Sequence, residues 1–323
     1  MTKTYNWGIL GAGKIAGKFV QDLHNVEGAK VYAVASRSLD RAKEFAETHS
    51  ADNFYGSYLE LVKDEAVDII YIATPHVFHF EHTMLALDHK KAVLCEKPMA
   101  MKREQVLEMI TKAKNEKVFL MEALWTYFLP HYNYVLDIVA SKKFGKLKEL
   151  KADFGFDAPF NTEKRIYNKD LGGGSLLDVG IYPVFAALTL LGKPDAIEAK
   201  ATIGKTGIDE NCCIQFNYNN GPIANLYSAI DETTPTEAIL IFEEAEITIK
   251  SRFHEPSSVE IRSKEGNKNV TFDVNSHGYN FEAAHVQQML TENRLQSTVM
   301  TFEKSLELIA LLDRIREKID LHY

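Results

Sequence analysis

The chain has 323 residues, of which 46% are hydrophobic and 25% are charged. At about 150 residues per domain, this length predicts two domains, and the composition excludes a mostly disordered chain. The 37 lysine and arginine residues face 45 aspartate and glutamate residues, which gives a formal net charge of −8. Because nucleic acids require a basic binding surface, we expect none among the partners of this protein.

Three features of the sequence concern the location of the protein. The longest strongly apolar stretch without charge, residues 179–192, contains Pro183 and is shorter than the ~20 residues of a membrane-spanning helix. The first residues run directly into an apolar strand pattern, which differs from a signal peptide. The cysteines (Cys95, Cys212 and Cys213) are odd in number and two are adjacent, which disfavours a disulfide framework. We therefore expect a cytoplasmic protein without membrane attachment.

The first 125 residues alternate short apolar runs with helical patterns, as in residues 39–48 and 102–115. The predicted strands are residues 5–10, 31–36, 67–74, 92–96 and 118–123. Near-continuous apolar strands joined by helices are typical of a parallel sheet that is covered on both faces. Residues 1–125 are therefore predicted to form a Rossmann domain that binds a dinucleotide.

The pattern changes in the second part, residues 126–323. A helix at 132–141 and a strand at 147–155 precede a series of strands, and two helical patterns, 281–292 and 302–318, end the chain. The strands of this series are predicted at residues 212–218, 223–230, 238–242, 246–250, 259–263 and 269–274, with a hairpin turn at Asn219-Asn220-Gly221. Short connections without crossover helices predict an open, mainly antiparallel sheet in an α+β domain for substrate binding and oligomerisation.

A glycine-rich turn follows the first predicted strand. Gly11, Gly13 and Ala16 form a G-x-G-x-x-A motif, in which Lys14 and Ile15 open the next helix. The first glycine permits a tight turn, and the second lets the backbone approach a pyrophosphate at the helix N-terminus. The strand–turn–helix context favours a dinucleotide site over a turn with a structural role only.

The end of the second strand indicates the cofactor. NAD-binding folds usually place an acidic residue here, whereas this chain has Ser36 and Arg37, with Arg41 one turn later. A serine does not repel a 2′-phosphate, and an arginine pairs with one bidentately. This favours NADP over NAD, although a solvated arginine after a strand is also common.

Thr74, His76 and His79 follow the third long strand, at the sheet edge that borders the cofactor crevice in such folds. The histidines His76, His79 and His82 recur at intervals of three and suggest a metal site. Only Glu81 is nearby to complete a ligand set, and it would face away from His79. We therefore predict no metal. A cofactor-edge role is favoured over histidines that merely start a helix.

Two further segments carry groups that exchange protons. Lys97 follows the fourth strand, where a nearby cationic nicotinamide and desolvation lower the pKa of a lysine. On its own, however, this residue is better explained as a surface lysine. Asp178 and Tyr182 follow the glycine run 172–174 and share one face of a helix. Such a pair suits general acid–base chemistry, and the alternative is a helix cap beside a buried tyrosine.

Together these motifs resemble the Gfo/Idh/MocA oxidoreductase family. They are G-x-G-x-x-A at 11–16, T-P-x-x-x-H at 74–79, C-E-K-P at 95–98 and G-G-G-x-L-x-D-x-G-x-Y at 172–182. Within the family the chain is most similar to the dihydrodiol dehydrogenase and NADP-dependent D-xylose dehydrogenase branch. The resemblance implies a Rossmann domain plus an open sheet that often forms an oligomer interface.

The resemblance also implies roles for individual residues. Lys97 and Tyr182 would lie at the reacting hydroxyl, with Asp178 nearby, as the catalytic residues. The expected cofactor contacts are Gly11, Gly13, Lys14, Ile15, Ser36, Arg37, Arg41, Thr74, His76, His79, Glu96 and Lys97. Expected substrate contacts are Trp125, Arg165 and Asn168, although Arg165 is equally well explained by a salt bridge between a loop and a carboxylate. Tyr127 replaces an arginine of the branch, so the substrate of the branch is not carried over.

The sequence thus predicts an NADP-dependent oxidoreductase that acts on the CH–OH group of a sugar, cyclic diol or small polyol. Tyr182 or Lys97 would handle the hydroxyl proton. Alternation of Ile214, Phe216 and Tyr218 on an uncovered sheet face predicts a homodimer or higher homo-oligomer. The alternatives are a non-catalytic NAD(P)-binding regulator, which has no need of the catalytic set, and a glycosidase with bound NAD, which would favour an acid at position 36.

Overall fold

The computed structural model describes residues 3–219 and 221–323. The contacts within the chain divide it into two compact units. Unit 1 comprises the residues up to Phe128 together with Asn275–Leu306, and unit 2 comprises Leu129–Val274 and Glu307–Tyr323. The predicted fold class, a Rossmann domain with an α+β domain built on an open sheet, is confirmed by these two units.

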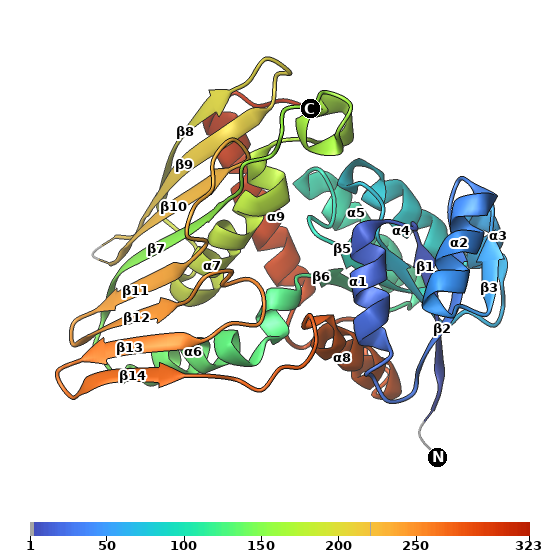
Figure 1. The fold of residues 1–323 in the computed structure, drawn as a ribbon, viewed down its shortest axis with the longest axis horizontal. Helices are drawn as coiled ribbons and strands as arrows, with labels where there is room; N and C mark the ends of the chain where they lie inside the picture. Colours follow the sequence, from blue (N-terminus) through green and yellow to red (C-terminus); the bar gives the residue numbers. More distant parts are fainter. Residues whose placement is uncertain (1–2, 220) are drawn as a thin grey trace. The chain divides into compact units, whose positions relative to one another are not determined.

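Unit 1 contains a six-stranded parallel sheet with the order β3-β2-β1-β4-β5-β6 (Figure 1). Its strands are β1 (Tyr5–Leu10), β2 (Ala29–Ala35), β3 (Asn53–Tyr55), β4 (Ile69–Ile72), β5 (Ala92–Glu96) and β6 (Leu120–Ala123). Its α-helices are α1 (Lys14–Leu23), α2 (Leu39–His49), α3 (Tyr58–Lys63), α4 (His79–Asp88), α5 (Arg103–Glu116) and α8 (Tyr279–Thr291). Short 3₁₀ helices lie at η1 (His76–Phe78) and η2 (Trp125–Phe128). The strand order reverses direction between β1 and β4, which is where ligands bind in sheets of this type.

Large aromatic side chains fill the core of unit 1. Trp7, Phe19 and Tyr71 are fully buried, and the rings of Phe19 and Tyr71 stack with centroids 3.7 Å apart. Two serines define the starts of helices in this unit, because the hydroxyls of Ser38 and Ser57 accept backbone N–H groups of the first turns of α2 and α3. The short edge strand β3 was missed in the sequence, since three residues show no alternation.

Residues 275–306 pack within unit 1, whereas the sequence pattern assigned the whole of 126–323 to the second domain. The buried Asp22 carboxylate on α1 accepts the backbone N–H groups of His277 and Tyr279 at 3.0 and 2.8 Å. The Trp7 indole donates to Gln287 at 3.1 Å. These contacts join residues more than 250 positions apart, so local patterns do not reveal them.

Unit 2 is built on an eight-stranded sheet with the order β14-β13-β12-β11-β7-β10-β9-β8 (Figure 1). The strands are β7 (Leu147–Gly155), β8 (Ala196–Ile203), β9 (Asp209–Asn217), β10 (Ile223–Ala229), β11 (Ala238–Phe242), β12 (Ala245–Ile249), β13 (Val259–Ser263) and β14 (Gly266–Val270). The helices are α6 (Pro130–Ser141), the π-helix η5 (Leu176–Gly180), α7 (Ile181–Leu191) and α9 (Phe302–Lys318), whose residues from Glu307 onward belong to this unit. Two short 3₁₀ helices are η3 (Arg165–Tyr167) and η4 (Lys169–Leu171).

All pairings in this sheet are antiparallel except that of β7 with β10. Strands β9 and β10 pair as the predicted hairpin requires, although Asn220 of the predicted turn lies outside the described residues. The last strand covers Gly266–Val270 rather than residues 269–274, because its pairing with β13 begins directly after a tight turn.

One face of the sheet in unit 2 is covered by α7, which packs on β7 and β10. The covered face carries the apolar side chains, including Cys212, Ile214 and Phe216, which are 0, 4 and 0% exposed. The prediction that Ile214 and Phe216 present an uncovered apolar stripe is therefore wrong. Alternation along β9 locates two faces but does not tell which of them a helix covers.

Helical residues Lys169–Leu191 are long and apolar enough to cross a membrane by length and composition. However, 83% of the most apolar window is buried inside the structure, where α7 contacts the sheet and α6. We interpret this stretch as the core helix of unit 2.

Candidate active site

The glycine-rich turn connects β1 to α1 at the carboxyl edge of the parallel sheet. Gly11 has a φ of +111°, and a Cβ atom there would lie 3.0 Å from the carbonyl oxygen of Ala73, so both backbone and space require glycine. A Cβ atom on Gly13 would have no neighbour within 4 Å, which leaves the backbone open at the start of α1. Lys14 is exposed and Ile15 is half-buried beside it. This geometry suits a pyrophosphate at the helix N-terminus.

A basic and aromatic group follows β2. Ser36 is 8% exposed, and Arg37 is exposed with its guanidinium 6.0 Å from the centroid of the Phe78 ring. The Phe78 ring stacks with His82, and burial together with the charge of Arg37 lowers the pKa of His82 to about 4. Arg41 is exposed on α2. Phe78 and His82 are not recognisable as part of this group from the sequence, because they lie about 40 residues further along the chain.

The loop after β4 is held by histidines. The Thr74 hydroxyl pairs with Nδ1 of His82 at 3.0 Å. His79 is 1% exposed; its Nδ1 lies 2.8 Å from the Pro98 carbonyl oxygen and its Nε2 lies 2.9 Å from that of Thr74. Burial lowers the pKa of His79 to about 4, so the neutral ring donates to one of these carbonyls at pH 7. His79 thus hydrogen-bonds the loops after β4 and β5 and is not exposed at the edge of the sheet. His76 is also buried.

Lys97 follows β5 and is half-buried. The preceding Glu96 is 7% exposed, accepts a hydrogen bond from the Tyr71 hydroxyl and accepts the backbone N–H of Lys97 at 3.2 Å. Both oxygens of Glu96 are therefore used inside unit 1. Burial raises the pKa of Glu96, whereas the Tyr71 hydrogen bond and the Lys97 charge oppose this shift.

Trp125, a predicted substrate contact, lies in η2 and is 4% exposed. Its ring stacks on that of Tyr279 from α8 with centroids 4.2 Å apart and planes 13° apart. Tyr279 itself contacts Phe19 edge to face. The sequence did not connect Tyr279 with this group, because α8 was assigned to the other domain.

In unit 2, Arg165 pairs with Asp178. Nη2 of Arg165 donates to Oδ1 of Asp178 at 2.5 Å, so the loop–carboxylate salt bridge considered from the sequence is present. Nη1 of Arg165 is buried and has no hydrogen-bond partner in the described part of the chain. Asn168 caps η4 with its side chain, which accepts the N–H of Asp170 at 2.9 Å.

Asp178 lies in the π-helix and Tyr182 in the first turn of α7, so one continuous helical segment carries both. Helical turns of π geometry are frequent at functional sites. Tyr182 is 7% exposed, and its ring lies 4.7 Å from that of His254 and 5.8 Å from that of Phe154. His254 was missed in the sequence because it lies in a loop without a motif.

Asp209 anchors the start of this segment. It is fully buried on β9, and its Oδ2 accepts the Ser175 hydroxyl at 2.7 Å and the Leu176 N–H at 2.6 Å. Burial raises the pKa of Asp209 to about 6, against these hydrogen bonds. Gly174 has a φ of +124°, and a Cβ atom there would lie 2.2 Å from Oδ1 of Asp209. The Tyr323 hydroxyl donates to the Gly173 carbonyl at 2.7 Å on the same loop.

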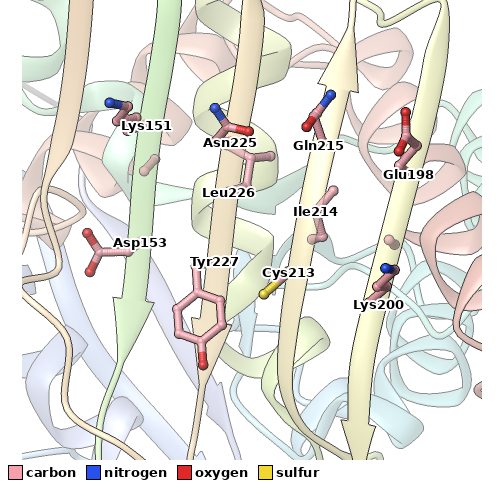
Figure 2. A pocket seen from close by; sticks show the side chains of 12 residues that line it. Lys151, Asp153, Glu198, Lys200, Cys213, Ile214, Gln215, Asn225, Leu226 and Tyr227 are labelled. Carbon is pink, nitrogen blue, oxygen red and sulfur yellow. The ribbon is translucent and has the colours of Figure 1, made fainter.

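The uncovered face of the sheet in unit 2 contains a shallow depression of about 490 Å³. Figure 2 shows polar side chains standing on this face from β7, β10, β9 and β8. They include Lys151, Asp153, Glu198, Lys200, Gln215, Asn225 and Tyr227. The face therefore carries side chains of both charges.

Comparisons with known proteins agree with these features. The profile of an oxidoreductase family with an NAD-binding Rossmann fold matches residues 5–124, and that of the GFO/IDH/MocA C-terminal domain matches residues 132–248. Trans-1,2-dihydrobenzene-1,2-diol dehydrogenase of Xenopus laevis is 36% identical over 331 residues, covering 98% of each chain. The scyllo-inositol 2-dehydrogenase (NADP(+)) IolU of Bacillus subtilis is 30% identical and covers 98% of this chain and 97% of its own.

Among solved structures, KijD10, a 3-ketoreductase from Actinomadura kijaniata in complex with NADP and TDP-benzene, has a TM-score of 0.88 at 24% identity, with 98% of each chain covered. At this identity the likeness shows the fold. The chain belongs to the GFO/IDH/MocA oxidoreductase family, as its motifs predicted.

The Asp209 anchor generates a first prediction. Gly174→Ala is expected to destabilise the protein by about 1–2 kcal/mol through its positive φ and by a further ~1–3 kcal/mol through the clash with Asp209. Gly192→Ala is the matched control, because Gly192 also has a positive φ but no atom within 4 Å of its Cβ position. Urea unfolding of both variants measures the difference. Equal losses would contradict the steric role of Asp209.

Proposed function

We propose that this chain is an NADP-dependent oxidoreductase that transfers a hydride between the nicotinamide C4 and a CH–OH or carbonyl carbon of a sugar, cyclic diol or small polyol. The observation that carries the proposal is the carboxyl edge of the parallel sheet. There the turn open at Gly13 follows β1 and the half-buried Lys97 follows β5, and only β4 separates these two strands in the sheet of unit 1. The relatives named above as diol and inositol dehydrogenases support the same chemistry.

The roles of the residues follow from their chemistry. Unit 1 would bind the dinucleotide, and unit 2 would supply substrate contacts. Tyr182 or Lys97 handles the hydroxyl proton, while the Asp178 carboxylate, paired with Arg165, orients or tunes them. The buried Nη1 of Arg165 supports a substrate contact, since it carries a donor without a partner in the described residues. A cofactor, when bound, supplies the hydride acceptor or donor.

The site after β2 supports NADP over NAD. Arg37→Ala is expected to weaken NADP binding by ~1.5–3 kcal/mol, the worth of a hydrogen bond to a charged group, and to leave NAD binding nearly unchanged. Fluorescence or calorimetric titration of both cofactors measures this. Arg314→Ala, an exposed arginine on α9, is the control and should affect neither cofactor. Equal losses for NADP and NAD in Arg37→Ala would refute the assignment.

The catalytic proposal predicts separate effects on rate and binding. Lys97→Met and Tyr182→Phe should each lower kcat by about 10²–10⁴, the usual contribution of a positioned acid or base, with a much smaller loss of NADP affinity. The double variant should lose less than the product of both losses, because groups that act as a unit are not additive.

The measurement is single-turnover NADPH absorbance with a substrate found by screening sugars, cyclic diols and their carbonyl forms. Tyr134→Phe is the control, since it removes a tyrosine hydroxyl on α6. If Tyr182→Phe turns over at the wild-type rate, the tyrosine is core packing and the proton role belongs elsewhere.

We also propose that the chain forms a cytoplasmic homodimer or higher homo-oligomer through the uncovered sheet face. Both signs of charge stand on this face, with Lys151 and Lys200 near Asp153 and Glu198 (Figure 2), which suits self-complementary pairing. The free cysteines Cys95, Cys212 and Cys213 fit a reducing compartment. Light scattering at micromolar concentration should give at least twice 36.5 kDa, and a 36.5 kDa particle would exclude the oligomer.

A further inference from the structure

Three carboxyl groups are deeply buried in unit 1. Glu96 on β5, Glu122 on β6 and Glu282 on α8 are 7, 3 and 0% exposed, and all lie in unit 1. We call these three residues the buried acid cluster. Acidic side chains are rarely this buried unless they are paired, so each needs a physical account.

Two members of the buried acid cluster have partners. Glu96 accepts hydrogen bonds from the Tyr71 hydroxyl and the Lys97 N–H, as described above. Oε1 of Glu122 accepts the backbone N–H of Met99 at 2.8 Å, and the Ser305 hydroxyl also hydrogen-bonds to this side chain. These two carboxyls therefore hold the loop on which Lys97 lies.

Glu282 differs from both. Neither of its carboxyl oxygens has a hydrogen-bond partner within the described residues, although the side chain is completely buried. Two ionisable groups interact with Glu282 electrostatically. The Glu96 charge disfavours the carboxylate of Glu282, and the carboxylate of Glu282 would repel the ionised form of Tyr71. Burying an unpaired carboxylate costs far more than burying a neutral acid. A hydrophobic residue at this position would cost less to bury, so the presence of an acid here points to a role.

The charges around Glu96 complete the electrostatic account. The Lys97 ammonium acts on Glu96 and Glu122 and favours their ionised forms. Burial raises the pKa of Glu122 to about 7, and burial followed by the charge of Glu96 raises that of Glu282 well above its usual value. The interactions described for Glu282 include no cation that would stabilise its carboxylate form.

We propose that Glu282 keeps its proton at neutral pH and so adds no negative charge to the Glu96 carboxyl beside Lys97. A further carboxylate there would favour the ammonium form of Lys97 more strongly and impede proton exchange. The functional part of this proposal rests on the proposed role of Lys97, whereas the protonation state of Glu282 does not.

The first test does not depend on activity. A buried acid that keeps its proton binds more protons in the folded than in the unfolded state, so it lowers stability as pH rises above the unfolded value of about 4.3. Glu282→Gln lacks this ionisation in both states. We therefore expect the melting temperature of Glu282→Gln, relative to wild type, to rise steadily between about pH 5 and pH 8. Glu108→Gln, an exposed glutamate on α5, is the control and should show a constant difference.

Infrared spectroscopy supplies a direct readout. The wild-type protein should show the carbonyl band of a protonated carboxylic acid at pH 8, and Glu282→Gln should lose it while Glu108→Gln retains it. Absence of the band from wild type at pH 8, or a melting difference independent of pH, would overturn the protonation of Glu282. Should Glu282→Gln fail to fold, absence of the band from the wild-type protein at pH 8 would still overturn the proposal.

The second test addresses the effect on Lys97. If Glu282 is already neutral, Glu282→Gln leaves the alkaline limb of the kcat/KM pH profile in place, whereas Glu96→Gln removes the carboxyl that accepts the Lys97 N–H and moves that limb to lower pH. A shift in Glu282→Gln as large as that in Glu96→Gln would overturn the charge assignment. An inactive wild type with an intact infrared band would instead refute the proposed function and leave the protonation of Glu282 standing.

Discussion

The interaction on which the rest of unit 1 depends is the burial of Glu96 at the end of β5. Its carboxylate receives the Tyr71 hydroxyl and the Lys97 N–H, so neighbouring strands of the sheet fix the loop that presents the Lys97 side chain. Burying this carboxylate without partners would cost free energy. The Lys97 ammonium, the Tyr71 hydroxyl and the Lys97 N–H offset that cost. The carboxyl closest to Lys97 in the chain is therefore held by the sheet and not by a flexible loop.

A similar constraint organises unit 2. The buried Asp209 holds the Ser175 hydroxyl and the Leu176 N–H, and thereby fixes where the helical segment with Asp178 and Tyr182 begins. The glycine before that segment has a positive φ and leaves no space for a side chain. In both units a buried acid on a strand thus positions a segment that carries a residue of the proposed acid–base set, and such rigid support is what a catalytic site requires.

Much of this architecture was predictable because its signals are local. Period-2 and period-3.6 patterns located most strands and helices, and the turn at Gly11 needs only its neighbours to be recognised. The contributions of Asp209 and Glu282 were not predictable, since an isolated acid within a helix or strand pattern reads as a solvated residue. The partners that bury them come from segments distant in sequence. The covered face of β9 was misassigned for the same reason, because the alternation does not show that the side of the strand with Ile214 is buried.

The central claim is that this chain moves a hydride between a carbinol carbon and the nicotinamide. The most direct measurement uses cyclic diols, inositols and sugars deuterated at the carbinol carbon, incubated with NADP and the wild-type protein, followed by mass spectrometry of the cofactor and the product. The account predicts reduced cofactor that carries one deuterium in its nicotinamide ring, together with the matching carbonyl product. Deuterium returned to a cleaved product without net cofactor reduction, or no transfer to the cofactor for any substrate, would contradict it.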